Sequence, residues 1–186
     1  MIDIRPYNPY WASEYSDIAA QIRAGLGGIA LEIHHIGSTS INNMPAKDVI
    51  DVQITVTNLL TPIDDIMTQL GYIRAQPIMD HCPAGADIPV TELKKKLYKL
   101  ERRPANVHVR ENGRLNQQFS VLSRDYLRAN QRVSAAYAQI KMALAQRAPL
   151  VEDGYYEIKD PVFDIIFAGA TVWAGTVAWK MPISDL

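Results

Sequence analysis

Residues 49–56 alternate polar and apolar side chains, and no other segment constrains the fold of this chain as strongly. The polar positions are Asp51, Gln53 and Thr55, and the positions between them are aliphatic. A period of two residues places the polar side chains on one face of an extended segment. The pattern therefore predicts a half-buried strand with a carboxylate and an amide side by side on its polar face.

The size and composition of the chain favour one domain that covers residues 1–186. A hydrophobic content of 48% is sufficient for one core in a chain of this length. The 19 lysines and arginines nearly balance 20 acidic residues, which leaves a net charge of −1. This balance argues against nucleic acid or an acidic membrane surface as the main partner.

Cysteine content and hydropathy predict a cytoplasmic protein without a membrane segment. Cys82 is the single cysteine and cannot form an internal disulfide. The first residues do not show the basic and then apolar pattern of a secretory leader. No apolar run approaches the roughly 18 residues that a membrane helix needs, and the most apolar stretch, residues 162–172, contains Asp164.

The elements predicted around the first strand alternate between helix and strand. Helices are indicated by apolar residues at spacings of three and four, and their ends by capping residues, proline or glycine. In order, the predictions are a helix at 9–26, a strand at 29–36, a loop at 41–48, a short helix at 61–71 and a brief strand at 72–75.

The middle of the chain allows two interpretations. Residues 76–89 contain three prolines and a glycine and predict a long surface loop. The basic stretch at 94–103 fits an amphipathic helix, but strands at 96–100 and 106–110 could instead form a hairpin. We favour the hairpin, in which His108 shares a face with its polar neighbours two residues away.

The last third of the chain is predicted to be helical. One helix spans 119–128, and apolar residues at helical spacing indicate a longer one from residue 133 to 144. A third helix is expected to open at Asp160-Pro161 and to bury one apolar stripe. That stripe consists of Val162, Ile165, Ile166, Gly169, Val172 and Trp173. Strands that mostly precede helices indicate an α+β or mixed α/β fold.

Gly37-Ser38 follows a predicted strand and precedes the Asp51 strand by about a dozen residues. Glycine lets backbone amides approach a phosphate oxygen, and serine adds a hydroxyl donor. Two carboxylates at alternate positions of a strand can together hold divalent metal ions, which activate an attacking oxygen and stabilise a leaving one. The arrangement suits a nucleotide phosphate.

Several separated motifs of the chain resemble the GrpB family, which is placed in the nucleotidyltransferase superfamily. The central matches are His35-Ile36-Gly37-Ser38-Thr39-Ser40, Pro45-Ala46-Lys47 and Ile50-Asp51-Val52. Further matches, in the family's order, are Pro6-Tyr7, Pro9, Trp11, Val107-His108-Val109, Phe119, Arg124-Asp125-Tyr126-Leu127-Arg128, Tyr137 and Lys141. Together they cover residues 4 to about 175. Some relatives are fused to the enzyme that phosphorylates dephospho-coenzyme A.

The resemblance implies a nucleotidyltransferase-like mixed sheet flanked by helices, with its site at the Gly37-Ser38 turn and the Asp51 strand. We expect Mg²⁺ to be held by Asp51 and Gln53, and catalysis to involve Asp51, Gln53 and His108, with His108 as a base. The expected ligand is a nucleotide or another phosphorylated small molecule. The residues expected to bind its phosphates are Gly37, Ser38, Thr39, Lys47, Arg124, Arg128 and Lys141.

Gln53 departs from the superfamily pattern, which has a second acidic residue at this position. An amide oxygen can ligate a hard cation, but it brings no negative charge. Two hypotheses therefore stand: a metal-dependent nucleotidyltransferase, and a module that binds a nucleotide or phosphometabolite without turnover. A third hypothesis gives the basic residues 94–103 a role in binding nucleic acid.

Further residues keep two interpretations at this stage. Arg124 and Arg128 either pair with Asp125 on their own helix or face a phosphate. His34 and His35 are adjacent, so only one of them can face a ligand. His81 and Cys82 lack a second pair of ligands at suitable spacing and predict no zinc site.

Overall fold

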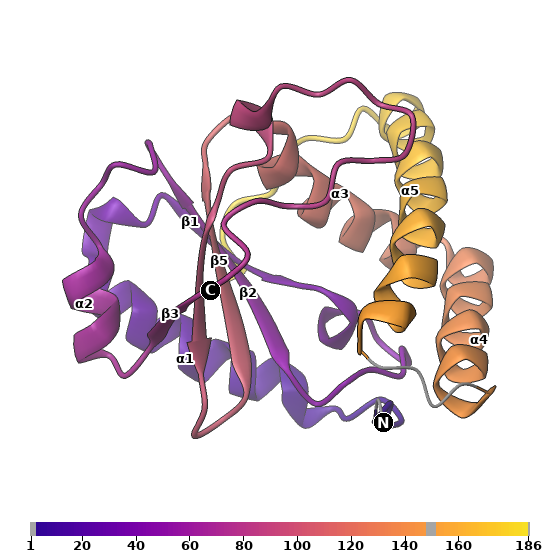
Figure 1. Cartoon of the computed structure of the whole chain (residues 1–186), viewed down its shortest axis with the longest axis horizontal. Helices are drawn as coiled ribbons and strands as arrows, with labels where there is room; N and C mark the ends of the chain where they lie inside the picture. The colour runs from indigo at the N-terminus through magenta and orange to yellow at the C-terminus, as the bar shows by residue number, and fades with distance from the viewer. Residues whose placement is uncertain (1–2, 148–151, 186) are drawn as a thin grey trace.

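The computed structural model describes residues 3–147 and 152–185 and contains a five-stranded mixed sheet in the order β1-β2-β5-β4-β3. Helices α1 and α2 cover one face of the sheet, and α3, α4 and α5 lie on the other side (Figure 1). The strands are β1 Glu32–Ile36, β2 Ile50–Val56, β3 Ile73–Ala75, β4 Lys96–Leu100 and β5 Ala105–Glu111. The helices are α1 Tyr10–Leu26, α2 Asp64–Gln69, α3 Leu115–Ala129, α4 Gln131–Arg147 and α5 Glu152–Val177. The predicted mixed sheet with a helical last third is confirmed.

Strand β2 lies between an antiparallel neighbour, β1, and a parallel neighbour, β5. Both of its faces are covered, and Gln53 and Thr55 have no exposed surface. The prediction of a half-buried strand is therefore wrong. The reason is α3, which packs over the polar face and supplies the carbonyl of Gln117 as an acceptor for the Gln53 amide at 2.9 Å.

The N-terminal helix begins and ends as the sequence predicts. The Asn8 side chain accepts a hydrogen bond from the backbone N–H of Tyr10 at 3.0 Å, and Gly27 ends the helix with a positive φ of 53°. One stripe of α1 is buried against the sheet, with Trp11 and Ile22 almost completely enclosed. The next strand starts at Glu32, three residues later than predicted, because residues 27–29 form a 3₁₀ turn.

The hairpin interpretation of the basic segment is correct. Strands β4 and β5 pair antiparallel, with Leu97 opposite His108. Three cations of this segment form separate ion pairs: Lys95 with Asp80, Lys96 with Asp64, and Arg103 with Glu14 and Asp48. They therefore do not form one continuous basic face on a helix.

Helix α5 is longer than predicted. It begins at Glu152, so Pro161 lies inside the helix instead of in its first turn. Asp-Pro is a helix-start pattern, but burial of Tyr155 stabilises the turns before the proline despite the hydrogen bond that the proline lacks. The predicted buried stripe is partly wrong, because Ile166 is buried whereas Ile165 and Val172 are 74% and 72% exposed. None of the described helices is both long enough and apolar enough to cross a membrane.

Replacing Ile54 with alanine tests whether β2 is the centre of the main core. Ile54 is fully buried, so Ile54→Ala removes buried methyl groups and leaves a cavity. We expect a loss of about 2–5 kcal/mol in unfolding free energy, measured by urea denaturation. The control Leu60→Ala changes a side chain that is 92% exposed and should alter stability by less than about 0.5 kcal/mol. Equal effects of the two substitutions would contradict this assignment of the core.

Candidate functional site

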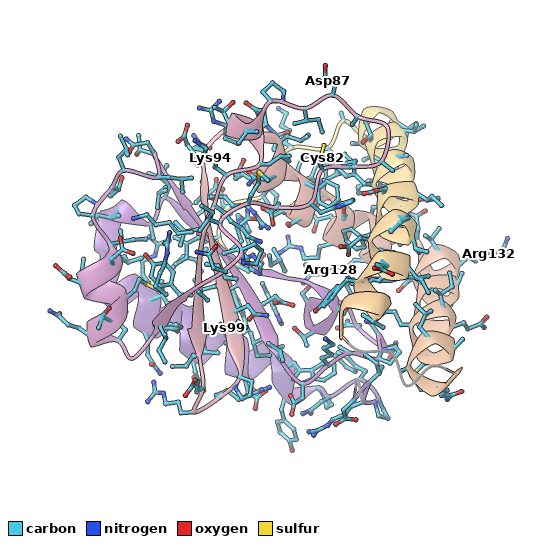
Figure 2. All side chains as sticks on the ribbon, viewed as in Figure 1. Cys82, Asp87, Lys94, Lys99, Arg128 and Arg132 are labelled. Carbon is cyan, nitrogen blue, oxygen red and sulfur yellow. The ribbon has the colours of Figure 1, made fainter. Side chains whose placement is uncertain are left out.

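A cavity of about 680 Å³ lies between the sheet and helices α4 and α5. Arg132, by contrast, points outward from α4 (Figure 2). The polar residues that line it include Ser38, Asp51, Asn106, His108, Tyr137 and Lys141. The cavity thus brings together groups from β2, β5, α4 and the turn after β1.

Gly37 allows the turn after β1 to approach Asp51. Its φ is +70°, and a Cβ atom at this position would lie 2.4 Å from Oδ2 of Asp51. Both the backbone conformation and the contact exclude a larger residue without rearrangement. The register that places Ile36 opposite Asp51 therefore brings the Gly37-Ser38 backbone directly against the carboxylate.

The Asp51 carboxylate contacts two side chains of β5. Nδ2 of Asn106 donates to Oδ1 of Asp51 at 3.0 Å, and Nε2 of His108 lies 3.8 Å from the same oxygen. Burial opposes ionisation of Asp51, but the interactions with His108 and Asn106 outweigh it and lower the pKa of this carboxyl. Burial lowers the pKa of His108, although Asp51 opposes the shift. The pair therefore favours an ionised aspartate beside a neutral imidazole.

The contact at Nδ1 of His108 determines which ring nitrogen carries the proton. Nζ of Lys95 lies 3.2 Å from Nδ1 of His108 and 2.6 Å from Oδ1 of Asp80. An ammonium group only donates hydrogen bonds, so Nδ1 accepts and the proton resides on Nε2. His108 consequently presents an N–H group toward Asp51 and is a hydrogen-bond donor in this arrangement.

The side chain of Gln53 is hydrogen-bonded to other protein groups and does not line the cavity. Its Oε1 accepts a 2.6 Å hydrogen bond from Arg110, and its Nε2 donates to the carbonyl of Gln117. Arg110, and not Gln53, lines the cavity. Within residues 3–147 and 152–185, no three His, Cys, Asp or Glu side chains are grouped so that they could hold a metal ion. Asp51, as the one carboxylate that β2 contributes, with a guanidinium nearby, does not fit a pair of Mg²⁺ ions.

Lys141 and Ser38 contact each other in the part of the cavity next to the turn after β1. The Lys141 ammonium donates to Oγ of Ser38 at 2.7 Å and to the carbonyl of Pro45 at 2.6 Å. Burial, with a smaller contribution from Lys159, lowers the pKa of Lys141 to about 7. Oη of Tyr137 is also buried here, and burial raises the pKa of Tyr137 against a smaller lowering effect of nearby Ser38. Within the described residues, this hydroxyl makes no hydrogen bond of good geometry.

Helix α5 contributes an aromatic and basic wall. Nζ of Lys47 lies 4.8 Å from the ring centre of Tyr156 and 3.2 Å from its hydroxyl. Nζ of Lys159 lies 5.5 Å from the same ring and 5.4 Å from the ring of Phe163. Alternating cations and rings can bind both negative charge and a flat aromatic group.

Most of the predicted site residues are brought together. Those that line the cavity are Gly37, Ser38, Thr39, Lys47, Asp51, His108, Arg124 and Lys141. The cavity lining does not include Gln53 or Arg128.

The two arginines predicted to bind phosphate are held by groups of the protein itself. Arg124 pairs with Asp125 at 2.8 Å and with Asp185, and it also donates to the carbonyl of His35. Arg128 donates twice to the carbonyl of Ser40, at 3.0 and 2.8 Å. Both side chains therefore hold the segment around the Gly37-Ser38 turn in place.

Neither of the adjacent histidines lines the cavity. His34 contacts the carbonyl of Pro182 at 3.1 Å. His35 stacks on Tyr15 and contacts Oγ1 of Thr39 at 3.0 Å, so it supports the turn from behind.

Sequence reasoning missed several residues of the cavity. Asn106 and Arg110 could have been found, because each lies two residues from His108 on the same face of its strand. Tyr155, Tyr156 and Lys159 gave no local signal. Their position depends on α5 extending nine residues before Pro161 and folding back over the sheet.

Similarity to other proteins extends over most of the chain. It is 31% identical to a protein named dephospho-CoA kinase from Mycolicibacterium paratuberculosis, with 94% of this chain and 47% of that protein covered. It is 29% identical to UPF0157 protein BH1888 of Halalkalibacterium halodurans, covering 91% of this chain and 82% of that protein. The chain therefore spans about half the length of the dephospho-CoA kinases that it matches.

Solved structures show the same architecture. The conserved protein GrpB from Enterococcus faecalis superposes with a TM-score of 0.74 at 23% identity, covering 92% of this chain and 99% of that one. Cid1, solved in complex with its short product ApU, gives a TM-score of 0.53 at 12% identity, covering 88% of this chain and 46% of that one. The second likeness identifies the fold as nucleotidyltransferase-like.

A family model also matches most of the chain. The family described as GrpB protein matches residues 1–168, which include both the Gly37-Ser38 turn and the Asp51 strand. This chain belongs to the GrpB family.

Proposed function

We propose that the cavity binds a phosphorylated small molecule, with a nucleotide as the leading candidate, and that a phosphate group contacts Ser38, Lys141 and Tyr137. The carrying observation is Lys141, which is only 2% exposed and forms no ion pair within the described residues. A buried ammonium group without an ion-pair partner is costly, and an anion bound beside it reduces that cost. The unpaired hydroxyl of Tyr137 supplies a further donor in the same part of the cavity.

The remainder of the cavity suits the other parts of a nucleotide. Its volume of about 680 Å³ lies within the usual range for small-molecule sites. The ring of Tyr156, with Lys47 and Lys159 near it, offers a surface for a base or another flat group. The fold relative Cid1 was solved with the dinucleotide product ApU, and curated relatives are named as dephospho-CoA kinases, which supports a ligand of this class.

We further propose that the ligand is bound without a two-metal nucleotidyl transfer. Gln53 provides no negative charge, and its oxygen accepts from Arg110 instead of facing the cavity. The alternative, Mg²⁺-dependent nucleotidyl transfer to a small acceptor, would rest on Asp51 as the one carboxylate of β2. The two proposals differ in whether Mg²⁺ is required and whether pyrophosphate is released.

Proton uptake during binding tests the role of Lys141. Because its pKa of about 7 should rise when a phosphate neutralises its charge, binding at pH 7.5 should take up a proton. Affinity for the anion should correspondingly fall as pH rises through 7. We expect calorimetry with ATP and EDTA, in buffers of different ionisation enthalpy, to show an uptake of about half a proton or more. Lys141→Met should abolish most of this uptake and weaken binding by about 10-fold or more.

Arg132→Met is the matched control for Lys141→Met. It removes one positive charge from the same helix, but Arg132 is exposed and lies on the outer side of α4. Affinity and proton uptake should match those of the unmodified protein. Equal weakening by both variants would point to general charge attraction, and absence of ATP binding at millimolar concentration would overturn the proposed ligand class.

Two acidic substitutions distinguish the metal-free proposal from its alternative. Gln53→Asp places a carboxylate against Arg110, so we expect an internal ion pair and no gain in Mn²⁺ affinity. Asn106→Asp places a carboxylate near Asp51, inside the cavity, and should raise Mn²⁺ affinity by about 10-fold or more. Both affinities are measurable by electron paramagnetic resonance. Release of pyrophosphate from ATP by the unmodified protein, dependent on Mg²⁺, would favour the alternative.

A further inference from the structure

One face of α5 is apolar yet uncovered. Three large aliphatic residues spaced seven apart, Ile158, Ile165 and Val172, are 46%, 74% and 72% exposed. Three residues after each of them stands a small or compact exposed residue; these are Pro161, Ala168 and Gly175. We call these six residues the α5 stripe. Positions that alternate three and four apart lie along one line of a helix, as they do in coiled coils.

The α5 stripe carries no charge along most of its length. The exposed residues of α5 from Pro161 onward are Pro161, Ile165, Ala168, Thr171, Val172, Gly175, Thr176 and Val177, all of them uncharged. Asp164 lies beside the stripe, but it is bound to His81 and to the backbone N–H of Ala84. An uncharged apolar surface of this extent, on a protein whose positive and negative charges nearly balance, indicates a site of contact with another protein surface. Two copies of it can meet without opposing like charges.

The order of large and small residues favours a second copy of this chain as the partner. When two identical helices pack antiparallel, the first and fourth positions of each heptad face each other. A large residue then meets a small one at every level: Ile165 meets the partner's Ala168, Val172 meets the partner's Pro161, and Ile158 meets the partner's Gly175. Parallel packing would instead place large residues against large ones and leave gaps between the small ones.

We propose that this protein forms a two-fold symmetric dimer in which the α5 stripes of two copies pack antiparallel. A two-fold axis between Ile165 and Ala168 satisfies all three pairs of residues at once, as a self-complementary interface requires. The small residues let the helix axes approach closely. The antiparallel arrangement also places opposite ends of the two helix dipoles together.

The dimensions of the interface indicate how tightly the two copies should bind. The stripe from Ile158 to Gly175 runs about 26 Å along the helix. Two faces of this length bury roughly 1,000–1,200 Å² in total, which is the lower end for specific protein interfaces. We therefore expect a dimer with a dissociation constant in the micromolar range.

Sedimentation velocity of the full chain between about 1 and 200 µM tests the dimer, because this range covers micromolar affinities. The unmodified protein should shift from monomer to dimer across this range. Ile165→Asp, which would place a charge at the centre of the interface, should raise the dissociation constant by about 50-fold or more. Leu60→Asp is the matched control, since Leu60 is 92% exposed and lies outside the stripe, and it should dimerise normally. Both variants should retain the melting temperature of the monomer.

Cysteine cross-linking tests the antiparallel arrangement. In a background with Cys82→Ser, the variants Val172→Cys and Pro161→Cys should form a mixed disulfide when combined, and Val172→Cys alone should form little disulfide dimer. A chain that stays monomeric at 200 µM, or a dimer that Ile165→Asp leaves intact, would overturn the proposal. Efficient disulfide formation by Val172→Cys alone would overturn the antiparallel packing.

Discussion

The buried guanidinium of Arg110 connects the parts of this structure that form the site. It is 4% exposed and donates to Gln53 on β2 and twice to Asp80 in the long loop after β3. Burial alone would raise the pKa of Asp80, but Arg110 and Lys95 outweigh it and hold this pKa well below its usual range. Loss of Arg110 would leave the buried oxygen of Gln53 without its donor and Asp80 with only Lys95 and Asn116 as side-chain donors, which is more costly than loss of an exposed pair.

The same interaction determines the chemistry of the cavity. By holding the oxygen of Gln53, Arg110 places a positive charge where a nucleotidyltransferase of this fold would have a second metal ligand. Asp80 in turn positions Lys95, and Lys95 sets the tautomer of His108. Through Asp80 and Lys95, the loop after β3 thus determines that the protonated nitrogen of His108 faces Asp51. The cavity thus contains a carboxylate, a neutral imidazole and a buried ammonium, and the proposal of anion binding rests on this set of groups.

The local parts of this arrangement could be predicted from the sequence. The helix at the N-terminus, the turn at Gly37-Ser38 and the β4-β5 hairpin all depend on short-range signals: capping residues, glycine and strand alternation. Two predictions failed because they depended on packing. The alternation around Gln53 indicated a solvent-exposed face, but a buried polar face looks the same when a helix supplies hydrogen-bond partners. Pro161 indicated a helix start, but tertiary contacts extended α5 on both sides of it.

The sequence by itself determined that Gly37, Ser38 and Asp51 lie at one site, since the turn and the strand register follow from residues near one another in the chain. It also determined the mixed sheet with a helical last third. Only the tertiary structure decided that Arg110 donates a hydrogen bond to Gln53 and that Lys141 contacts Ser38, more than one hundred residues away in sequence. It also decided that α5 closes the cavity and leaves the α5 stripe exposed. The physical reason is that a hydrogen bond to a buried side chain requires a donor at a specific position in space, and neighbours in sequence do not encode that position when distant elements supply it.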